Sequence, residues 1–245
     1  MKYFKTFANH SDYESYINGG GVIYPNLSIC EQEYDFHIKE MNSYVEIGGL
    51  KWATMNLGAS SITDYGLYFA WGDTQGYMAS QVGSGEGQKY FAWADYKYCD
   101  GATNPTSANM TKYNSIDGKT VLDLSDDSAF ATWGGNWRIP TKEQFVALGA
   151  ATTTAWTADY MGSGVAGMIV TDKTDSSKVL FFPAAGFARE GTMNLVNTYG
   201  YYRGKSLYDT ILNPFDVYFT PSNVDWQSHG SYRRTGFSVR AVLNE

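Results

Sequence analysis

The chain has 245 residues, enough for one large domain, and 43% of them are hydrophobic, so a sizeable core can form. Its formal net charge is −7 without any run of Lys or Arg, which argues against a nucleic-acid partner because an acidic surface repels phosphate backbones. No stretch approaches the roughly 18 apolar residues of a membrane span. The 26 Gly and the 16% aromatic content are typical of a loop-rich fold that consists mainly of β-strands.

Residues 1–42 differ in pattern from the rest of the chain. A capping-box pattern at Ser11–Glu14 predicts a short helix as far as about Asn18, and the alternation over 34–38 predicts a half-buried strand. This segment is too small to hold a core, so we expect it to attach the protein to a partner. Its start lacks the apolar region of a signal peptide, which indicates a chain that has lost its leader or one made in a cytosol.

Short strands and turns begin at Tyr44. Tyr44–Ile47 and Leu50–Ala53, separated by Gly48 and Gly49, predict a β-hairpin. Residues 66–72 form a further apolar, aromatic run. Residues 73–120 are long, polar and irregular, as in an elaborated loop.

Two short helices are predicted in the middle of the chain. The first covers about 126–131, with Ser125 as N-cap and acidic residues in the first turn. The second covers 142–149 after a capping-box pattern at Thr141–Gln144, and it buries Phe145 and Leu148.

After residue 162 the chain is predicted to be nearly all β. The runs 167–171 and 178–183 flank a turn at 175–177. Over 215–219, Phe215, Val217 and Phe219 alternate with polar residues, so we expect Asp216 and Tyr218 to face solvent.

Five segments together resemble the Fibrobacter major paralogous domain family, which is common in Bacteroidetes and their phages. In family order they are GGLKWATMNLGA (48–59), YGLYFAWGDT (65–74), WGGNWRIPTKEQF (133–145), LFFPAAGFARE (180–190) and TGFSVRAV (235–242). The resemblance implies an α+β, C-type-lectin-like domain over 43–245, related to sulfatase-modifying enzymes and to retroelement-diversified variable proteins. The N-terminal segment resembles a leader of phage and prophage structural proteins.

The residues of these motifs have mainly structural explanations. The four tryptophans can each bury roughly 150–250 Å², and the two arginines can satisfy buried backbone carbonyls. These residues are Trp52, Trp71, Trp133, Trp137, Arg138 and Arg240. The stretch 200–206 departs from the family pattern, which favours a segment read by a partner.

Catalytic and metal-binding patterns are weak. His10, His37 and His229 lie in separate contexts without a neighbouring ligand, and Asp126 and Asp127 are explained by helix capping. Both Cys30 and Cys99 precede the region in which the related sulfatase-modifying enzymes use cysteine, and we expect both to be ordinary reduced thiols. We therefore expect no catalytic residue, cofactor or metal ion.

The C-terminal stretch 199–234 has the composition of an adaptable binding surface, rich in Tyr, Ser, Asn, Gly and Arg. In the related diversified proteins this region carries the variable positions, so we hypothesise that it varies here too. The expected ligand-binding residues are Tyr201, Tyr202, Arg203, Tyr208, Asp216, Tyr218, Asn223, Asp225, Trp226, His229 and Tyr232.

These observations predict a binding protein, in first place a receptor-binding component of a phage tail fibre, located in the virion. Its expected partners are a host-surface protein or glycan and, through residues 1–42, other virion or fibre proteins, with a homo-oligomer left open. One alternative is a bacterial cell-surface adhesin with the same domain. Another is an enzyme similar to the sulfatase-modifying proteins.

Overall fold

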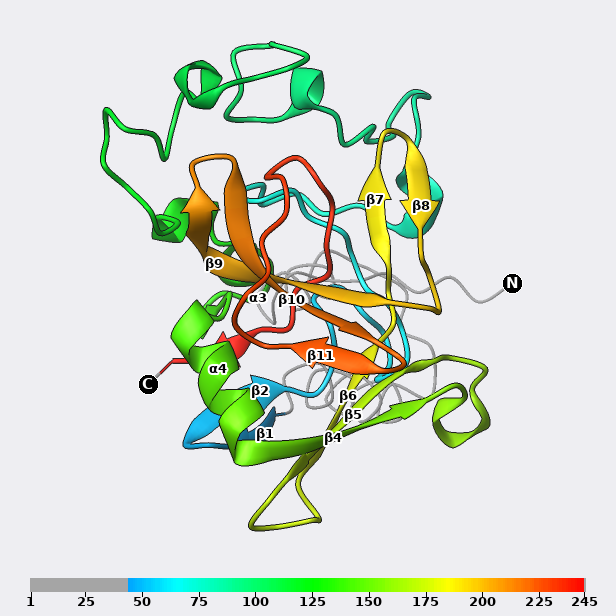
Figure 1. The fold of residues 1–245 in the computed structure, drawn as a ribbon. Helices are drawn as coiled ribbons and strands as arrows, with labels where there is room; N and C mark the ends of the chain where they lie inside the picture. The colour runs from blue at the N-terminus through cyan, green and yellow to red at the C-terminus, as the bar shows by residue number, and fades with distance from the viewer. Residues whose placement is uncertain (1–43, 245) are drawn as a thin grey trace, which may run out of the picture. The chain divides into compact units, whose positions relative to one another are not determined.

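The computed structural model describes residues 44–244 (Figure 1). The expectations for residues 1–42, including the attachment segment and its helix, lie outside the described residues, as do His10, His37 and Cys30. The described residues belong to one compact unit. The described part is a mixed α+β fold dominated by antiparallel strands.

The described strands form four small sheets, in the orders β1-β2-β12-β3, β11-β10-β9, β4-β5-β6 and β7-β8. All of their strand pairs are antiparallel. The strands are β1 (Tyr44–Ile47), β2 (Leu50–Ala53), β3 (Trp137–Arg138), β4 (Thr152–Thr157), β5 (Gly167–Asp172), β6 (Val179–Pro183), β7 (Phe187–Arg189), β8 (Thr192–Asn194), β9 (Gly200–Thr210), β10 (Asn213–Thr220), β11 (Asn223–Asp225) and β12 (Val242–Leu243).

Several local predictions are confirmed. The hairpin pairs Ile47 with Leu50 across the turn at Gly48 and Gly49, both of which adopt positive φ. The predicted strands 167–171 and 178–183 correspond to β5 and β6, which pair with each other. Residues 73–120 hold three one-turn 3-10 helices, Ala79–Gln81, Trp93–Asp95 and Ser107–Asn109, and are otherwise irregular. In Figure 1 this cyan-to-green segment arches over one end of the described unit, beyond the β9–β10 hairpin.

The second predicted helix is confirmed as α4 (Lys142–Ala151). The Oγ1 atom of Thr141 accepts from the backbone N–H of Gln144 at 3.3 Å, and Oε1 of Gln144 accepts from the N–H of Thr141 at 2.9 Å. This is the reciprocal capping box that the sequence predicts. Phe145 and Leu148 are fully buried on the inner face of α4.

The first predicted helix begins later than expected, and its N-cap is not Ser125. A 3-10 turn covers Leu124–Asp126, and α3 covers Ser128–Trp133 with Asp127 as N-cap. Oδ1 of Asp127 accepts from the N–H groups of Ala129, Phe130 and Ile139 at 3.0–3.2 Å. Because the Asp127 carboxylate accepts from the N–H groups of the first turn, Asp127 and not Ser125 is the residue at which the helix begins.

Two hydrophobic clusters form the core of the described unit. One contains Trp71 and collects aromatic residues from the long loop, including Phe91, Trp93 and Tyr113. The other contains Trp52 and lies among α4, β5, β6, β9 and β10. Burial of large aromatic side chains therefore attaches the irregular loop to the sheets.

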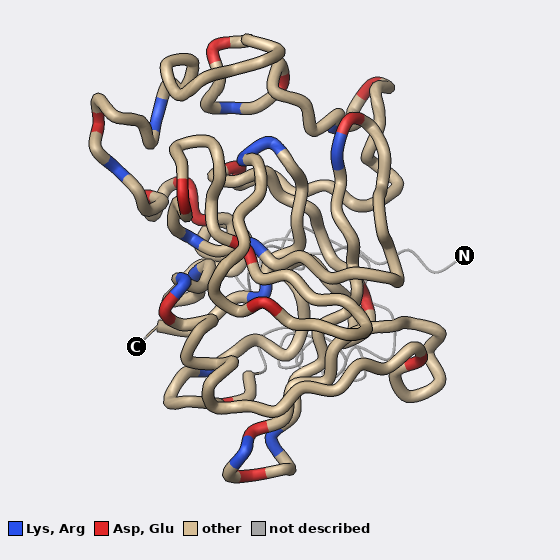
Figure 2. The backbone as a smooth tube through the Cα atoms, in the orientation of Figure 1, with Lys and Arg blue, Asp and Glu red and all other residues tan. Residues whose placement is uncertain are grey.

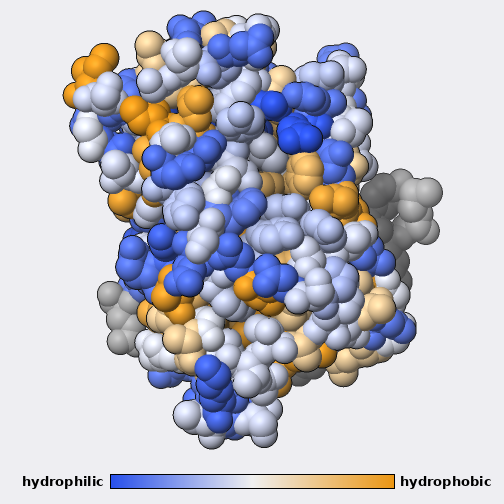
Figure 3. Space-filling model, in the orientation of Figure 1, coloured by the Kyte–Doolittle hydropathy of each residue, from blue (hydrophilic) through white to orange (hydrophobic). Residues whose placement is uncertain are grey.

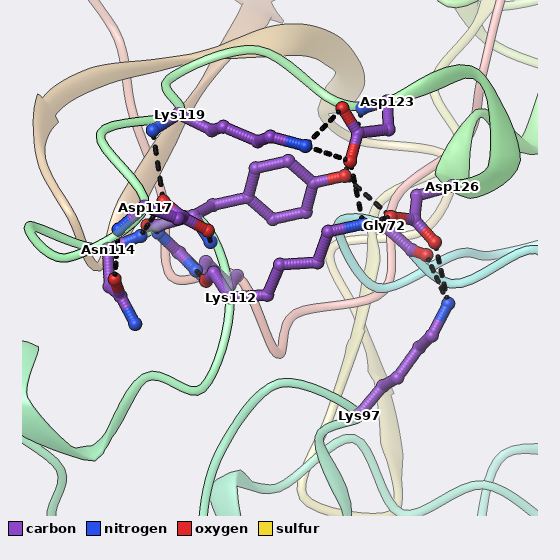
Figure 4. Close-up of polar contacts among 10 residues, drawn as sticks. Gly72, Lys97, Lys112, Asn114, Asp117, Lys119, Asp123 and Asp126 are labelled. Atoms are coloured by element: carbon purple, nitrogen blue, oxygen red, sulfur yellow. Dashed lines mark hydrogen bonds and ion pairs between the residues drawn. The ribbon is translucent and has the colours of Figure 1, made fainter.

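A charged network also holds the loop, as Figure 4 shows. The Asp126 carboxylate is buried and lies 2.5 Å from Nζ of Lys112 and 3.0 Å from Nζ of Lys97. It also accepts from the hydroxyl of Tyr113 at 2.5 Å. Burial works against ionisation, but the hydrogen bonds from Lys112 and Tyr113 outweigh it and hold the Asp126 pKa well below its usual range.

Buried arginines satisfy backbone carbonyls, as the motifs predict. Arg240 is completely buried and donates to the carbonyl oxygens of Ala53, Thr54 and Phe181 and to Oδ1 of Asn56. These bonds join β2, β6 and the C-terminal segment. Burial lowers the Arg240 pKa to about 10.

Candidate functional site

The first predicted site residue to correct is Asp216, which was expected to face solvent and is fully buried. Residues 229–231 pair with the edge of β10 opposite β9: the Asp216 N–H donates to the His229 carbonyl at 3.2 Å, and the Ser231 N–H donates to the Pro214 carbonyl at 3.2 Å. The register of β10 against β9 also shifts between Pro214 and Asp216. The His229 side chain over Asp216 and the strand irregularity together remove the simple alternation of buried and exposed residues.

Arg203 lies beside Asp216 and is also buried, with 1% of its surface exposed. Its Nη2 donates to the Thr235 carbonyl at 2.7 Å, and its Nη1 lies 3.8 Å from Oδ1 of Asp216. The guanidinium also stacks over the ring of Phe237, 4.1 Å from its centroid. Burial lowers the Arg203 pKa to about 10, while the Asp216 charge acts in the opposite direction. Arg203 and Asp216 therefore support the surface from beneath rather than contact a ligand.

Tyr202 is the third predicted ligand-binding residue that is fully buried. Its hydroxyl donates to the Pro183 carbonyl at 2.8 Å and accepts from Nδ2 of Asn56 at 3.2 Å. Its ring packs against Phe182 and Phe219 in the core. Tyr201 and Tyr202 lie next to each other on β9, so they face opposite sides of the sheet.

Three of the predicted residues come together above Asp216. The rings of Tyr218 and His229 stack with centroids 5.0 Å apart, and Tyr201 lies 5.3 Å from Tyr218 and 5.9 Å from His229. Tyr199 adds a fourth ring, 6.0 Å from Tyr218. All four are half-buried, so each presents part of its ring to solvent. We refer to Tyr199, Tyr201, Tyr218 and His229 as the aromatic cluster.

The cluster is fixed by a hydrogen bond to the buried carboxylate below it. Nδ1 of His229 lies 2.5 Å from Oδ2 of Asp216. This contact raises the His229 pKa above its ordinary value, although burial opposes the shift. Burial also raises the Tyr201 pKa to about 12, so the Tyr201 hydroxyl stays protonated at neutral pH. The cluster thus offers aromatic faces, hydroxyl groups and one titratable imidazole.

The residues of β11 border the aromatic cluster. Asp225 pairs across the strands with Tyr218, and its Oδ1 accepts from the N–H groups of Gln227 and Ser228. Asn223 is exposed at the other end of β11. Trp226 is half-buried, and its ring lies against Gly149 of α4, where a Cβ atom would come within 2.6 Å of it. Asp225 therefore extends the predicted surface, while Trp226 also has a packing role.

Tyr208 and Tyr232 are not part of this cluster. Tyr208 lies under Nζ of Lys142, 4.8 Å from its ring centroid. Tyr232 packs against Trp93 of the long loop at 5.5 Å and lines a cavity of about 310 Å³. The predicted ligand-binding residues that reach the surface therefore do not form one site: Tyr208 and Tyr232 lie apart from the aromatic cluster.

Several residues of the aromatic cluster and of the cavity beside Tyr232 are not among the ligand-binding residues predicted from the sequence. Tyr199 lies in the same tyrosine-rich stretch, which is a signal that could have included it. Trp93, Glu190 and Arg234 line the cavity beside Tyr232, but they come from three separate parts of the chain. No local pattern connects them before the chain folds.

The described surface shows no dominant charge. Figure 2 shows acidic and basic positions interspersed along the described backbone, and Figure 3 shows small apolar patches among polar ones on the visible face. Within residues 44–244 no three His, Cys, Asp or Glu side chains are grouped as metal ligands would be. Cys99 is a half-buried free thiol. None of the described helices is long and apolar enough to cross a membrane.

Comparison with protein-family models finds no match for this chain, and neither the curated proteins nor the solved structures contain a significant match.

Proposed function

We propose that this protein is a non-catalytic recognition module, a receptor-binding component of a phage tail fibre that contacts a host-surface protein or glycan. The aromatic cluster carries the proposal, because it offers half-exposed Tyr and His rings on a rigid support. Tyr and Trp side chains provide large contact areas at a low cost in conformational entropy, and they dominate binding energies in many interfaces.

The buried pair beneath the cluster supports a recognition role. Arg203 and Asp216 are held by the β9–β10 hairpin and by residues 235–238, so the rings above them are preorganised. Preorganisation lowers the cost of binding because few side chains must be immobilised. The motifs at 48–59 and 235–242, which resemble the Fibrobacter major paralogous domain family, support a C-type-lectin-like classification of the fold. The resemblance of the N-terminal segment to a leader of phage and prophage structural proteins supports a virion location and attachment to fibre proteins through residues 1–42.

The test is binding of the fluorescently labelled full chain to intact Bacteroidetes cells, compared with binding of Tyr218→Ala. We expect the substitution to weaken binding by about 2 kcal/mol, because it removes a central ring of the cluster. Ile116→Ala serves as a matched control, since Ile116 is 94% exposed and lies in the long loop. Binding of Tyr218→Ala at the strength of the unsubstituted chain would refute the proposed surface. Absence of binding to every strain of a broad panel would refute the recognition role.

A further inference from the structure

The cavity beside Tyr232 lies between the long loop and the C-terminal segment, apart from the residues of the aromatic cluster. Its lining residues come from 92–94, 103–105, Glu190, Leu212, Tyr232 and Arg234. Its volume of about 310 Å³ lies at the lower end of the range typical of small-molecule sites, roughly 300–1,000 Å³. Tyr232 is 46% exposed, so the cavity has an aromatic residue accessible from solvent.

An unusual arginine forms one wall of the cavity. Arg234 is 8% exposed, its Nη1 donates to the Phe91 carbonyl at 3.2 Å, and its Nη2 lies 2.9 Å from Oε1 of Glu190. Its guanidinium lies 5.7 Å from the ring centroids of both Trp93 and Tyr232. The buried Nε atom of Arg234 has no hydrogen-bond partner.

The backbone is strained at two non-glycine residues: Glu190, which lines the cavity, and the fully buried Phe91, which precedes the lining residue Ala92. Phe91 has φ 57° and Glu190 has φ 50°, both in the left-handed region that costs of order 1 kcal/mol or more per residue. The two segments are tied together by a 2.7 Å hydrogen bond from the Gly191 N–H to the Tyr90 carbonyl. Strained residues of this kind cluster at binding sites, where the surrounding structure holds them in place.

The charges of the cavity select the class of ligand. The carboxylate of Glu190 neutralises the guanidinium of Arg234, so an anion would have to displace Glu190 and a cation would have to displace Arg234. A purely apolar ligand would remove water from polar side chains of the lining, among them the 57% exposed Glu190, without replacing its hydrogen bonds. An uncharged ligand with many hydroxyl groups and one apolar face can satisfy the polar groups of Arg234, Glu190 and Asn104 and also contact the ring of Tyr232.

We propose that this cavity binds one uncharged sugar unit of a glycan, with Tyr232 as the stacking platform and the Arg234–Glu190 pair as hydrogen-bonding groups. The inference rests on the proposed recognition function but concerns a different set of residues. The aromatic cluster and the cavity would then contact separate parts of a host-surface ligand, or the cavity would act alone.

The experiment is saturation-transfer NMR with the full chain and separate samples of glucose, galactose, mannose and N-acetylglucosamine, with glucuronate as the anionic probe. We expect transfer to at least one neutral sugar and none to glucuronate. Tyr232→Ala should weaken binding of that sugar roughly tenfold or more, while Tyr232→Phe, which keeps the ring, should retain most of it. Tyr44→Ala is the matched control, because Tyr44 is 47% exposed, as Tyr232 is 46% exposed, but lies in β1 against Lys51.

Three outcomes would overturn the proposal: no transfer to any of the neutral sugars, unchanged binding by Tyr232→Ala, or a preference for glucuronate that Glu190→Gln strengthens. Asn104→Ala gives a second readout on an exposed side chain, in case changes near Trp93 impair folding. Its expected effect is also weaker binding of the sugar. Because Tyr218→Ala leaves the cavity unchanged, failure of the sugar site and failure of the aromatic cluster are distinguishable.

Discussion

The imidazole of His229 lies over a fully buried carboxylate, with 2.5 Å between its Nδ1 and Oδ2 of Asp216. The carboxylate is also 3.8 Å from Nη1 of Arg203, so a buried ion pair continues below the imidazole. Residues 229–231, β10 and β9 are thus linked by polar contacts that run from His229 through Asp216 to Arg203. Loss of Arg203 or Asp216 leaves the other buried charge without this partner, which is costly.

Stability should depend on pH through His229. Its folded-state pKa is raised, chiefly by the hydrogen bond to Asp216, with Asp225 adding to the shift and Arg203 opposing it. A raised folded-state pKa stabilises the fold, and this contribution is fully present at pH values below the unfolded-state pKa of about 6.5. It disappears as the pH rises through the folded-state pKa. We expect the Tm difference between the unsubstituted chain and His229→Asn to be largest near pH 6 and to shrink towards pH 9. A difference that is constant or grows with pH would contradict this assignment.

Tyr202 should affect stability rather than binding. Tyr202→Phe keeps the ring but removes a hydroxyl that donates to the Pro183 carbonyl and accepts from Asn56. We expect a loss of about 1 kcal/mol in the free energy of unfolding, measured in urea. Binding to cells should stay unchanged because the side chain is fully buried. Tyr201→Phe, on the half-buried neighbour, is the control for stability.

The charged network at Asp126 should anchor the long loop. Asp126→Asn leaves Lys97 and Lys112 without their shared carboxylate, and we expect a loss of about 1–2 kcal/mol at pH 7 because both lysines are partly exposed. The lowered pKa of Asp126 means that its contribution is present above the unfolded value and is lost as pH falls through the folded one.

The difference between the unsubstituted chain and Asp126→Asn should therefore be constant from pH 7 to about 5 and shrink in stronger acid. Urea unfolding at a series of pH values measures it. Asp123→Asn, at a more exposed partner of Lys112, should have a smaller effect. Equal losses in the free energy of unfolding for the two substitutions would show that burial of Asp126 does not increase its contribution to stability.

Arg240 should be the most sensitive of the buried arginines to a conservative change. It makes five hydrogen bonds to Ala53, Thr54, Asn56 and Phe181, and Lys has fewer donors in a different geometry. We expect Arg240→Lys to cost about 3 kcal/mol. Arg138→Lys is the matched control, since Arg138 is half-buried and bonds only to nearby carbonyls among its described partners. Thermal unfolding that ranks the two variants in the reverse order would contradict this expectation.

Local patterns in the sequence determined the elements that depend on neighbouring residues. The β1–β2 hairpin follows from Gly48 and Gly49 between two apolar runs, and α4 follows from the capping box at Thr141–Gln144. In both cases the signal and the structure lie within a few residues of each other. The start of α3 was misplaced because Asp127, and not Ser125, accepts from the N–H groups of the first turn, and a further bond from the distant Ile139 N–H holds the same carboxylate.

Tertiary structure alone decided which polar residues of the C-terminal stretch are accessible. Asp216 has the spacing of an exposed strand residue, yet it is buried because residues 229–231 pair with the edge of β10 and bring the His229 side chain over its carboxylate. The cavity beside Tyr232 likewise exists because the long loop brings Trp93 to the C-terminal segment. Periodicity reports which face of a strand a side chain occupies, whereas burial depends on what distant segment covers that face, and this contact is formed only when the chain folds.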